Sequence, residues 1–483
     1  MDPALFAAEV LIELPYSAND QQTAVVGALS RFCLTPAAAD CAFILNGYAG
    51  TGKTSLTGAL VRVLERHKRH VMLLAPTGRA AKVFSANSQG HPAYTIHRKI
   101  YRHNPDASTG GYSLPVPAEN KLRDAVFIVD EASMIGTADE HGSNLLDDLM
   151  TFVFSGDNCR LILVGDTAQL PPVGAERSPA MNPEVLRSMG LKVSTATLTE
   201  TARQAADSGI LFNATRLRKV MTAISRGAAG DTVPVPRLKP GSDVVVVEGP
   251  ELPDVMMSAY DNSAAGPADT ILITRSNRRA TEYNAAIRAQ VLYREEELTQ
   301  GDMLIVSKNH YFPRRTHGVD FIANGDIVTV SKVYGTEVAF GHRFADVRIE
   351  LPSPDDPEKP VSFDMKILLD SLADTAPMMS REQADAFYAE LISDNGPYAS
   401  LDPAARVWAA RKNEYWNALN VKYAYAVTCH KAQGGQWANV FVDLAYIPED
   451  ALGLALYRWL YTAVTRARTK LFLIAPPEAL VGN

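Results

Sequence analysis

The chain is poor in the features that identify secreted, membrane and metal-clustering proteins. Its 483 residues include only four cysteines, which are widely separated and form no CxxC pair, so neither a disulfide framework nor a zinc site is predicted. No apolar run approaches the length of about eighteen residues that a membrane span needs. The first residues, MDPALFAAEVLIELPYS, lack the basic region of a targeting signal. We therefore expect a protein of a reducing cytoplasm with no membrane partner.

The chain also lacks a strong excess of charge. Its net charge is −7, with 21% charged and 47% hydrophobic residues, which excludes a disordered chain and a protein coated in basic surface. A local basic groove for nucleic acid remains compatible with this balance. The length exceeds that of one ordinary hydrophobic core and predicts roughly two to four domains.

Short apolar runs alternate with helical patterns through the first two hundred residues. They are CAFIL at 41–45, VMLLAP at 71–76, AVFIVDE at 125–131 and RLILVGD at 160–166. These runs are continuous rather than alternating in polarity, which is typical of parallel strands covered by helices on both faces. The pattern predicts an α/β domain.

The remaining segments predict further elements. Residues 101–124 are rich in turn formers and favour a small excursion such as a β-hairpin over a disordered loop. A second α/β segment is expected to begin at 194–200 and to continue through 269–288. Short strands separated by Gly, Asn and Pro at 298–365 predict a small barrel-like β module, and 366–420 reads as mostly helical.

Residues 47–54, GYAGTGKT, fit the phosphate-binding pattern GxxxxGK[ST] at every position. The loop follows an apolar run and opens a helical pattern, so its backbone N–H groups and the helix N-terminus are expected to hold phosphates. Lys53 would reach the β and γ phosphates, and Thr54 would bind Mg²⁺. The nucleotide-binding residues predicted in this loop are Gly47, Gly50, Thr51, Gly52, Lys53, Thr54 and Ser55.

Two further strand ends carry polar residues suited to nucleotide hydrolysis. Asp130 ends the run VFIVDE and is expected to hold Mg²⁺, while the adjacent Glu131 can accept a proton from an attacking water. This pair favours an ATPase over a kinase, which takes its nucleophile from a bound substrate. Asp166 and Gln169 follow the run RLILVG, and a parallel sheet would bring them beside the other two ends, where Gln169 could sense the γ phosphate.

With these stretches the sequence resembles the superfamily 1B helicases, the 5′→3′ class that includes RecD and the phage Dda helicase. Other stretches resemble further motifs of that class: LAPTGRAAKVFS (74–85), YTIHRKI (94–100), LTETARQ (198–204), YAYAVTCHKAQGGQW (423–437) and LYTAVTRART (460–469). The resemblance implies an α/β fold with two RecA-like parallel-sheet motor domains. It also implies a β-hairpin inserted in the first domain and an SH3-like β module with a helical extension inserted in the second.

The resemblance gives expected domain boundaries. The first motor domain is expected at 1–195, with its hairpin at 101–124. The second is expected at 196–297 and 421–483, interrupted by the inserted module at 298–420.

The resemblance also implies residues that contact the nucleotide from outside the phosphate loop. Arg203 and Arg466 of the second domain would reach the γ phosphate, and an arginine that crosses a cleft stabilises transition-state charge only when the cleft is closed. Gln204 and Gly434 are further expected nucleotide contacts. Gln21 is the expected reader of adenine, which favours ATP as the nucleotide.

A single DNA strand is expected to cross both domains, its phosphates held by hydroxyls, backbone amides and cations. Tyr112, beside the TGG turn, is the candidate for the hairpin tip that splits a duplex, with a plain solvated turn as the alternative. The residues expected to bind DNA are Pro76, Thr77, Arg79, Lys82, Thr95, His97, Tyr112, Thr428, His430 and Lys431.

The resulting hypothesis is an ATP- and Mg²⁺-dependent DNA helicase that moves 5′→3′ on single-stranded DNA and unwinds forked duplex. It would act as a monomer in a bacterial or phage-infected cytosol, with replication or recombination proteins such as a single-strand-binding protein as partners. Its expected task is DNA replication, recombination or repair. Two alternatives remain open: a helicase-like ATPase that remodels nucleoprotein or RNA without separating strands, and a P-loop kinase or switch.

Overall fold

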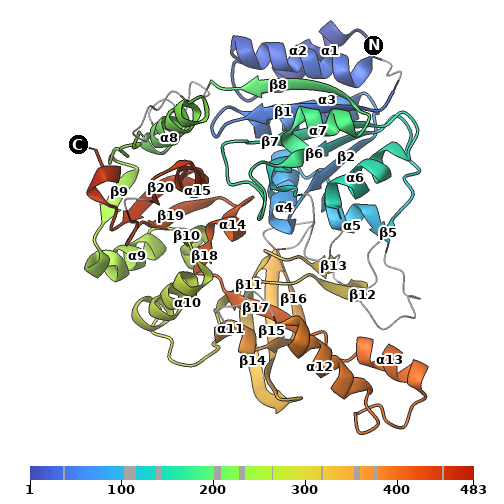
Figure 1. The fold of residues 1–483 in the computed structure, drawn as a ribbon, viewed down its shortest axis with the longest axis vertical. Coiled ribbons are helices and arrows are strands. Elements are labelled where there is room, and N and C mark those ends of the chain that lie inside the picture. Colours follow the sequence, from blue (N-terminus) through green and yellow to red (C-terminus); the bar gives the residue numbers. More distant parts are fainter. Residues whose placement is uncertain are drawn as a thin grey trace.

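The computed structural model contains two α/β domains and a β-barrel (Figure 1). It describes residues 1–35, 39–102, 116–136, 144–200, 208–227, 234–263, 265–316, 319–352, 359–373, 379–448 and 451–482. In Figure 1 the barrel, drawn in yellow to orange, lies below the two α/β domains. The expected fold class is therefore confirmed.

The first domain is built on a six-stranded parallel sheet of order β3-β2-β6-β7-β1-β8. Its strands are β1 (Cys41–Gly47), β2 (Val71–Ala75), β3 (Ala93–Thr95), β6 (Val126–Val129), β7 (Arg160–Gly165) and β8 (Lys192–Leu198). Its main helices are α1 (Pro3–Ile12), α2 (Asp20–Leu34), α3 (Lys53–Arg66), α4 (Gly78–Asn87), α5 (Ile96–Ile100), α6 (Leu145–Phe154) and α7 (Pro183–Ser188).

Helices cover both faces of this sheet, which explains the continuous apolar runs. Along β1, Phe43 and Leu45 pack in one apolar cluster with residues of α1, α2 and α3. Ala42 and Ile44 point to the other face and pack in a second cluster with residues of α6. Each large side chain buried in this way contributes about 2 kcal/mol to folding. Because both faces of the sheet are buried, polar side chains of these strands are expected at the strand ends.

Strand β8 corrects one expected boundary. The pattern at 194–200 was expected to open the second α/β domain, with the boundary after residue 195. Instead β8 pairs with β1 along its length, from Lys192 beside Cys41 to Leu198 beside Gly47. It is an edge strand with mostly exposed side chains, and such a pattern does not indicate which of two sheets the strand extends.

The second domain has a five-stranded parallel sheet of order β18-β10-β19-β20-β9. Its strands are β9 (Val244–Val247), β10 (Thr270–Thr274), β18 (Ala426–Thr428), β19 (Trp437–Asp443) and β20 (Ala467–Ile474). Its helices include α8 (Gly209–Ser225), α9 (Leu252–Asp261), α10 (Asn277–Ala286), a π-helical turn at Ile287–Val291, α14 (Cys429–Ala432) and α15 (Leu454–Val464).

The inserted module is a closed barrel of five strands. They are β11 (Met303–Val306), β14 (Ile327–Ala339), β15 (His342–Pro352), β16 (Pro360–Leu368) and β17 (Leu419–Tyr423). A separate pair is formed by β12 (His310–Thr316) and β13 (Val319–Ile322), and the helices are α11 (Asp370–Ala373), α12 (Arg381–Ile392) and α13 (Pro403–Arg411). Because β17 closes the barrel against β11 and β16, the module runs past the expected end at residue 420.

The two ends of the expected hairpin excursion meet as antiparallel strands. β4 (Tyr101–Arg102) pairs with β5 (Val116–Pro117), so residues 102 and 116 lie side by side. Tyr112, the expected tip residue, lies outside the described residues.

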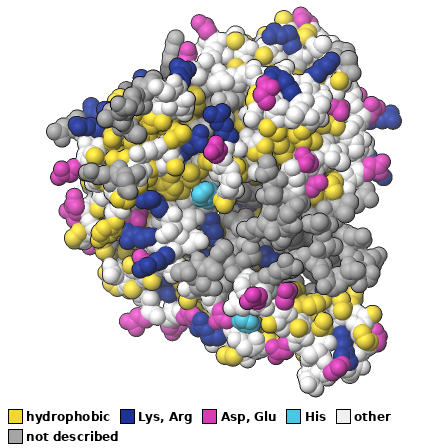
Figure 2. All heavy atoms as spheres, viewed as in Figure 1, with side chains coloured by type: hydrophobic (Ala, Val, Ile, Leu, Met, Phe, Trp, Pro, Cys, Tyr) yellow, Lys and Arg dark blue, Asp and Glu magenta, His cyan; other side chains and the backbone are white. Residues whose placement is uncertain are grey.

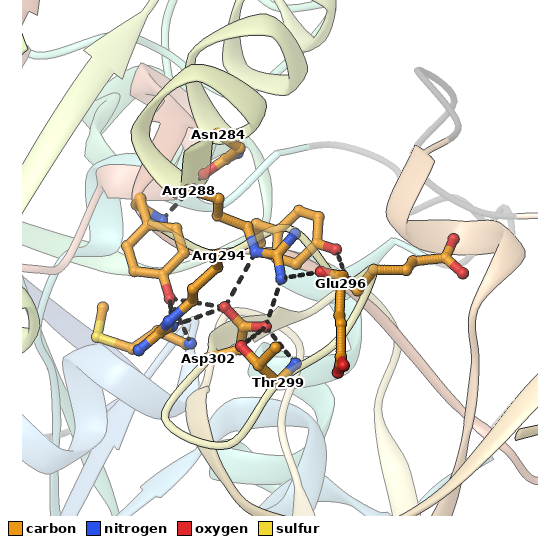
Figure 3. Close-up of polar contacts among 10 residues, drawn as sticks. Asn284, Arg288, Arg294, Glu296, Thr299 and Asp302 are labelled. Atoms are coloured by element: carbon orange, nitrogen blue, oxygen red, sulfur yellow. Dashed lines mark hydrogen bonds and ion pairs between the residues drawn. The ribbon is translucent and has the colours of Figure 1, made fainter. Parts of the chain in front are cut away.

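A buried ionic cluster joins the barrel to the second domain (Figure 3). Asp302, fully buried just before β11, accepts hydrogen bonds from Arg288 of the π-helical turn (3.1 and 3.0 Å), from Arg294 (2.7 Å) and from the Thr299 N–H (2.8 Å). The Tyr425 hydroxyl donates a further bond to it (3.0 Å). Burial alone would raise the pKa of Asp302, but the bonds from Arg288 and Thr299 bring it below its ordinary value. The cluster fixes the barrel at one orientation on the domain.

In the described part of the chain, no helix combines the length and apolar character needed to cross a membrane.

Candidate nucleotide and nucleic-acid site

The phosphate-binding loop lies between β1 and α3, at the carboxyl edge of the first sheet. Gly50 and Gly52 have φ angles of +75° and +84°, which glycine adopts without strain. A Cβ atom at Gly52 would also collide with the Tyr16 hydroxyl. The glycines therefore let the backbone take the loop conformation that turns into α3, whose N-terminus favours an anion.

Two side chains hold the loop from within the first domain. Lys53 Nζ donates to the carbonyl oxygens of Gly47 and Tyr48, the latter at 3.0 Å. Gln22 Nε2 donates to the carbonyl oxygen of Thr51 at 3.0 Å, and Gln22 is only 1% exposed. Gln22 thus fixes the loop directly.

The neighbouring glutamine, Gln21, lies elsewhere. Its Oε1 accepts the N–H groups of Thr199 (2.7 Å) and Glu200 (3.1 Å), just after β8. Of these two glutamines, the sequence predicted only Gln21 as a nucleotide contact and did not predict a role for Gln22. A signal for Gln22 existed in the spacing Asn19-x-x-Gln22, because these two residues form the capping box of α2 and so turn Gln22 inward.

The Asp130–Glu131 pair ends strand β6. The Asp130 N–H donates to Leu74 of the adjacent β2, and Asp130 Oδ1 accepts the Glu131 N–H, both at 2.9 Å. Glu131 has φ +52°, a left-handed conformation that is strained for a residue other than glycine. Loss of hydration raises the pKa of Asp130 to about 7, and the Glu131 carboxylate adds to the rise. A nearby cation would favour the ionised form of Asp130.

Strand β7 lies between β6 and β1, so Asp166 ends beside both the loop and the carboxylate pair. Asp166 is 1% exposed, and its Oδ1 accepts the Ala168 N–H at 2.9 Å. Gln169 is 6% exposed, and its side-chain oxygen has no hydrogen-bond partner among the described residues. A buried amide oxygen of this kind is available to a ligand or a water. The parallel sheet brings the three predicted strand ends together.

The second domain contacts this edge of the first. The Leu170 N–H donates to Thr462 Oγ1 of α15 (2.8 Å), and the Leu170 carbonyl accepts Gln433 Nε2 (2.9 Å). Arg466, buried just after α15, donates to the carbonyl oxygens of Thr462 (3.1 Å) and Gly435 (3.2 Å). Its guanidinium is thus held by its own domain at the joint. Arg203 and Gln204 lie outside the described residues.

The residues predicted to bind DNA in the first domain follow the adjacent strands β2 and β3. Thr77, preceded by Pro76, caps the N-terminus of α4, and Thr95 caps α5. Because Ala75 and Thr95 are register partners, both hydroxyl residues lie at the same sheet edge. The ring of His97 lies 5.7 Å from that of Tyr101.

In the second domain, Thr428 ends β18 and precedes α14, which carries His430 and Lys431. Lys431 Nζ donates to Ser307 Oγ in the barrel segment at 3.4 Å. Figure 2 shows Lys and Arg side chains and a histidine along the boundary between the two α/β domains on this face.

The two sets meet across the domain boundary. A Cβ atom on Gly434, which has φ +72°, would lie 3.0 Å from the Ala80 side chain and 3.3 Å from Thr77 Oγ1. Gly434, expected to contact nucleotide, therefore lies beside residues expected to bind DNA. The Arg79 guanidinium lies 3.9 Å from the centre of the Trp437 ring, and burial lowers the pKa of Arg79 to about 10, so it keeps its charge at neutral pH. Another residue expected to bind DNA, Lys82, pairs with Asp326 of the inserted module at 3.2 Å.

Together the fold and the site define a P-loop protein built from two RecA-like domains. Residues 18–235 match the AAA domain family, and residues 423–474 match the UvrD-like helicase C-terminal domain family. With the relatives described next, these matches confirm the predicted resemblance to superfamily 1B helicases of the RecD-like and Dda-like kind.

Two relatives carry the comparison. The ATP-dependent RecD2 DNA helicase of Deinococcus radiodurans is 34% identical over 168 residues, which are 35% of this chain and 20% of the relative. The ATP-dependent DNA helicase dda of Enterobacteria phage T4 is 25% identical over 467 residues, covering 89% of this chain and 93% of the relative. The chain thus matches a small part of the first relative and nearly the whole length of the second.

Solved structures of Pif1 helicases also align with the chain. One, of two Pif1 helicases coordinating at forked double-stranded DNA, has a TM-score of 0.49 at 15% identity and covers 97% of this chain and 95% of its own. Bacteroides Pif1 with ADP-AlF3 and single-stranded DNA has a TM-score of 0.45 at 15% identity, covering 96% and 94%.

Proposed function

We propose that the chain is an ATP-dependent DNA helicase that moves 5′→3′ along single-stranded DNA and unwinds forked duplex. The observation that carries the proposal is the joint between the domains: the sheet edge with the phosphate loop is hydrogen-bonded to α15 and to Gln433 of the second domain. A nucleotide bound there would lie where the two domains meet, so its hydrolysis would change the position of one domain relative to the other. The names of the RecD2 and Dda relatives support DNA as the substrate.

The proposed chemistry uses residues of both domains. Glu131 accepts a proton from the attacking water, while Lys53 and Arg466, together with Arg203, stabilise negative charge on the phosphates. Thr54 and Asp130 would supply the oxygen ligands that Mg²⁺ prefers, and the ion when bound would neutralise phosphate charge. Because Gly434 lies close to Thr77 across the domain boundary, a movement of the two domains would alter the spacing between the DNA contacts on either side of it.

The supporting experiment is ATP hydrolysis with and without defined single strands. The helicase proposal requires stimulation by single-stranded DNA and its loss in Lys53→Ala. Turnover that is indifferent to DNA would favour a kinase or switch. Removal of residues 106–114 should abolish unwinding while ATPase activity persists. Unwinding that survives the deletion would favour another strand-separating element. A wild-type protein that hydrolyses ATP but never unwinds duplex would favour a nucleoprotein remodeller.

We further propose that the protein works as a monomer in the cytosol on forked DNA, with a single-strand-binding protein as a partner. Analytical ultracentrifugation with and without a forked duplex tests the monomer.

A further inference from the structure

Tyr461 of α15 connects two parts of the nucleotide site from the opposite domain. Its side chain is 1% exposed. Its hydroxyl accepts the Ala49 N–H at 2.9 Å and donates to Asp166 Oδ2 at 2.6 Å. Burial, followed by the Asp166 carboxylate, raises the pKa of Tyr461 well above its ordinary value, so the donated proton stays on the hydroxyl. One phenol oxygen thus serves both as acceptor and as donor across the domain boundary.

Both partners of Tyr461 belong to the predicted ATP site. Ala49 is in the phosphate loop, between Gly47 and Gly50, where backbone N–H groups face phosphates. Asp166 ends β7 and begins the segment that carries Gln169. A single N–H cannot bond fully to two acceptors. If the Ala49 N–H bonds to a phosphate when nucleotide binds, its hydrogen bond to the Tyr461 hydroxyl therefore weakens.

The next residue of the helix extends this connection to Arg466. Thr462 Oγ1 accepts the Leu170 N–H (2.8 Å), and the Thr462 carbonyl accepts Arg466 Nε (3.1 Å). Successive residues of one helix therefore contact the phosphate loop, the segment after β7 and the arginine. A helical turn transmits small displacements with little loss because its residues are close-packed and hydrogen-bonded.

We propose that Tyr461 is a positioning residue of the ATPase, which sets the joint between the domains through Ala49 and Asp166 and so places Arg466 for hydrolysis. The inference rests on the proposed function and adds to it a residue that acts through others. Removing the hydroxyl should leave nucleotide binding nearly intact and slow the hydrolytic step.

The chain offers a matched control on the same helix. Tyr457 is fully buried, and its hydroxyl has no hydrogen-bond partner among the described residues. Tyr461→Phe and Tyr457→Phe therefore make the same chemical change in the same helix, and only the first removes bonds to the other domain.

The test measures single-stranded DNA-stimulated ATPase together with the affinity for a fluorescent ATP analogue. We expect Tyr461→Phe to lower kcat about tenfold, the size of a lost hydrogen bond to a charged group, with nucleotide affinity changed by less than about threefold. Tyr457→Phe should keep kcat within about twofold. A kcat for Tyr461→Phe equal to that of the control overturns the inference.

A second variant keeps the test decisive if Tyr461→Phe fails to fold. Asp166→Asn retains the shape of the side chain and weakens the acceptor, so it should lower kcat in the same way. Where Tyr461→Phe does fold, the double variant should lose less than the product of the two single losses, because both variants affect the bond between Tyr461 and Asp166; fully multiplicative losses contradict the inference. A wild-type protein without DNA-stimulated ATPase overturns the proposed function and this inference with it, whereas a stimulated wild type with unaffected variants overturns the inference alone.

Discussion

Lys82 of α4 and Asp326 of the inserted module form an ion pair of 3.2 Å that joins the first domain to the barrel. The Asp326 side chain is 5% exposed and also accepts the Ala323 N–H at 3.1 Å, whereas the Lys82 side chain is 38% exposed. Lys82 is one of the residues predicted to bind DNA. The carboxylate therefore holds a cation for which a DNA phosphate would compete.

Asp326→Asn should strengthen binding of single-stranded DNA, because it releases Lys82 and removes a negative charge beside the predicted track. We expect the half-saturating DNA concentration to fall about threefold at low salt, and less at high salt, as for a partly exposed charge interaction. Fluorescence anisotropy with a labelled oligonucleotide measures this at two salt concentrations. Asp364→Asn removes the same charge from an exposed pair with Arg348 elsewhere on the barrel and should change little. Equal effects of the two variants would contradict a specific role for Asp326.

Glu131→Gln should stop ATP hydrolysis while nucleotide still binds. A glutamine cannot accept the proton of the attacking water, and losing a general base lowers the rate by about 10²- to 10⁴-fold. Steady-state ATPase and analogue binding measure the two effects. The matched control is Glu184→Gln on α7, a largely exposed glutamate, which should keep the wild-type rate. An undiminished rate in Glu131→Gln would refute the assignment.

Asp302→Asn should destabilise the protein by about 3 kcal/mol at pH 7, because it leaves the buried Arg288 and the partly buried Arg294 without their carboxylate. The pKa of Asp302 is lower in the folded protein than in the unfolded chain, where it is about 3.9. Its contribution is therefore complete above that value and is lost as the pH falls through the folded pKa.

Urea unfolding of the wild-type protein and of Asp302→Asn at several pH values measures how the stability difference depends on pH. The stability difference should hold from pH 8 to about pH 5 and narrow only below about pH 4. A difference that already vanishes near pH 6 would mean that Asp302 is not the ionised centre of the cluster.

Gln21→Ala and Gln22→Ala should have different effects, because the two adjacent side chains have different contacts. Gln22→Ala leaves the Thr51 carbonyl without its donor and should cost about 1 to 2 kcal/mol of stability and raise the KM for ATP. Gln21→Ala should leave stability nearly unchanged and weaken the preference for ATP over GTP. Thermal unfolding and ATPase with both nucleotides test the pair. Loss of nucleotide preference in Gln22→Ala alone would reassign the adenine contact.

Local pattern predicted the parts of the site that lie on a single strand or loop. The glycine loop with Lys53 and the strand ends at Asp130 and Asp166 could be placed together because parallel strands end at one edge. Contacts between distant segments could not be predicted. The sequence of α15 does not indicate that Tyr461 bonds to Asp166. The sequence of an edge strand such as β8 does not indicate which sheet the strand joins. Closure of the barrel by β17, long after β16, depends equally on tertiary pairing.

The most direct test of the proposed helicase activity is unwinding of duplexes that carry a single-stranded tail at one end only. With ATP and Mg²⁺, we expect strand release from the substrate with a 5′ tail, none from its 3′-tailed counterpart, and none from either in Lys53→Ala. Release confined to the 3′-tailed substrate, or release that persists in Lys53→Ala, would contradict it.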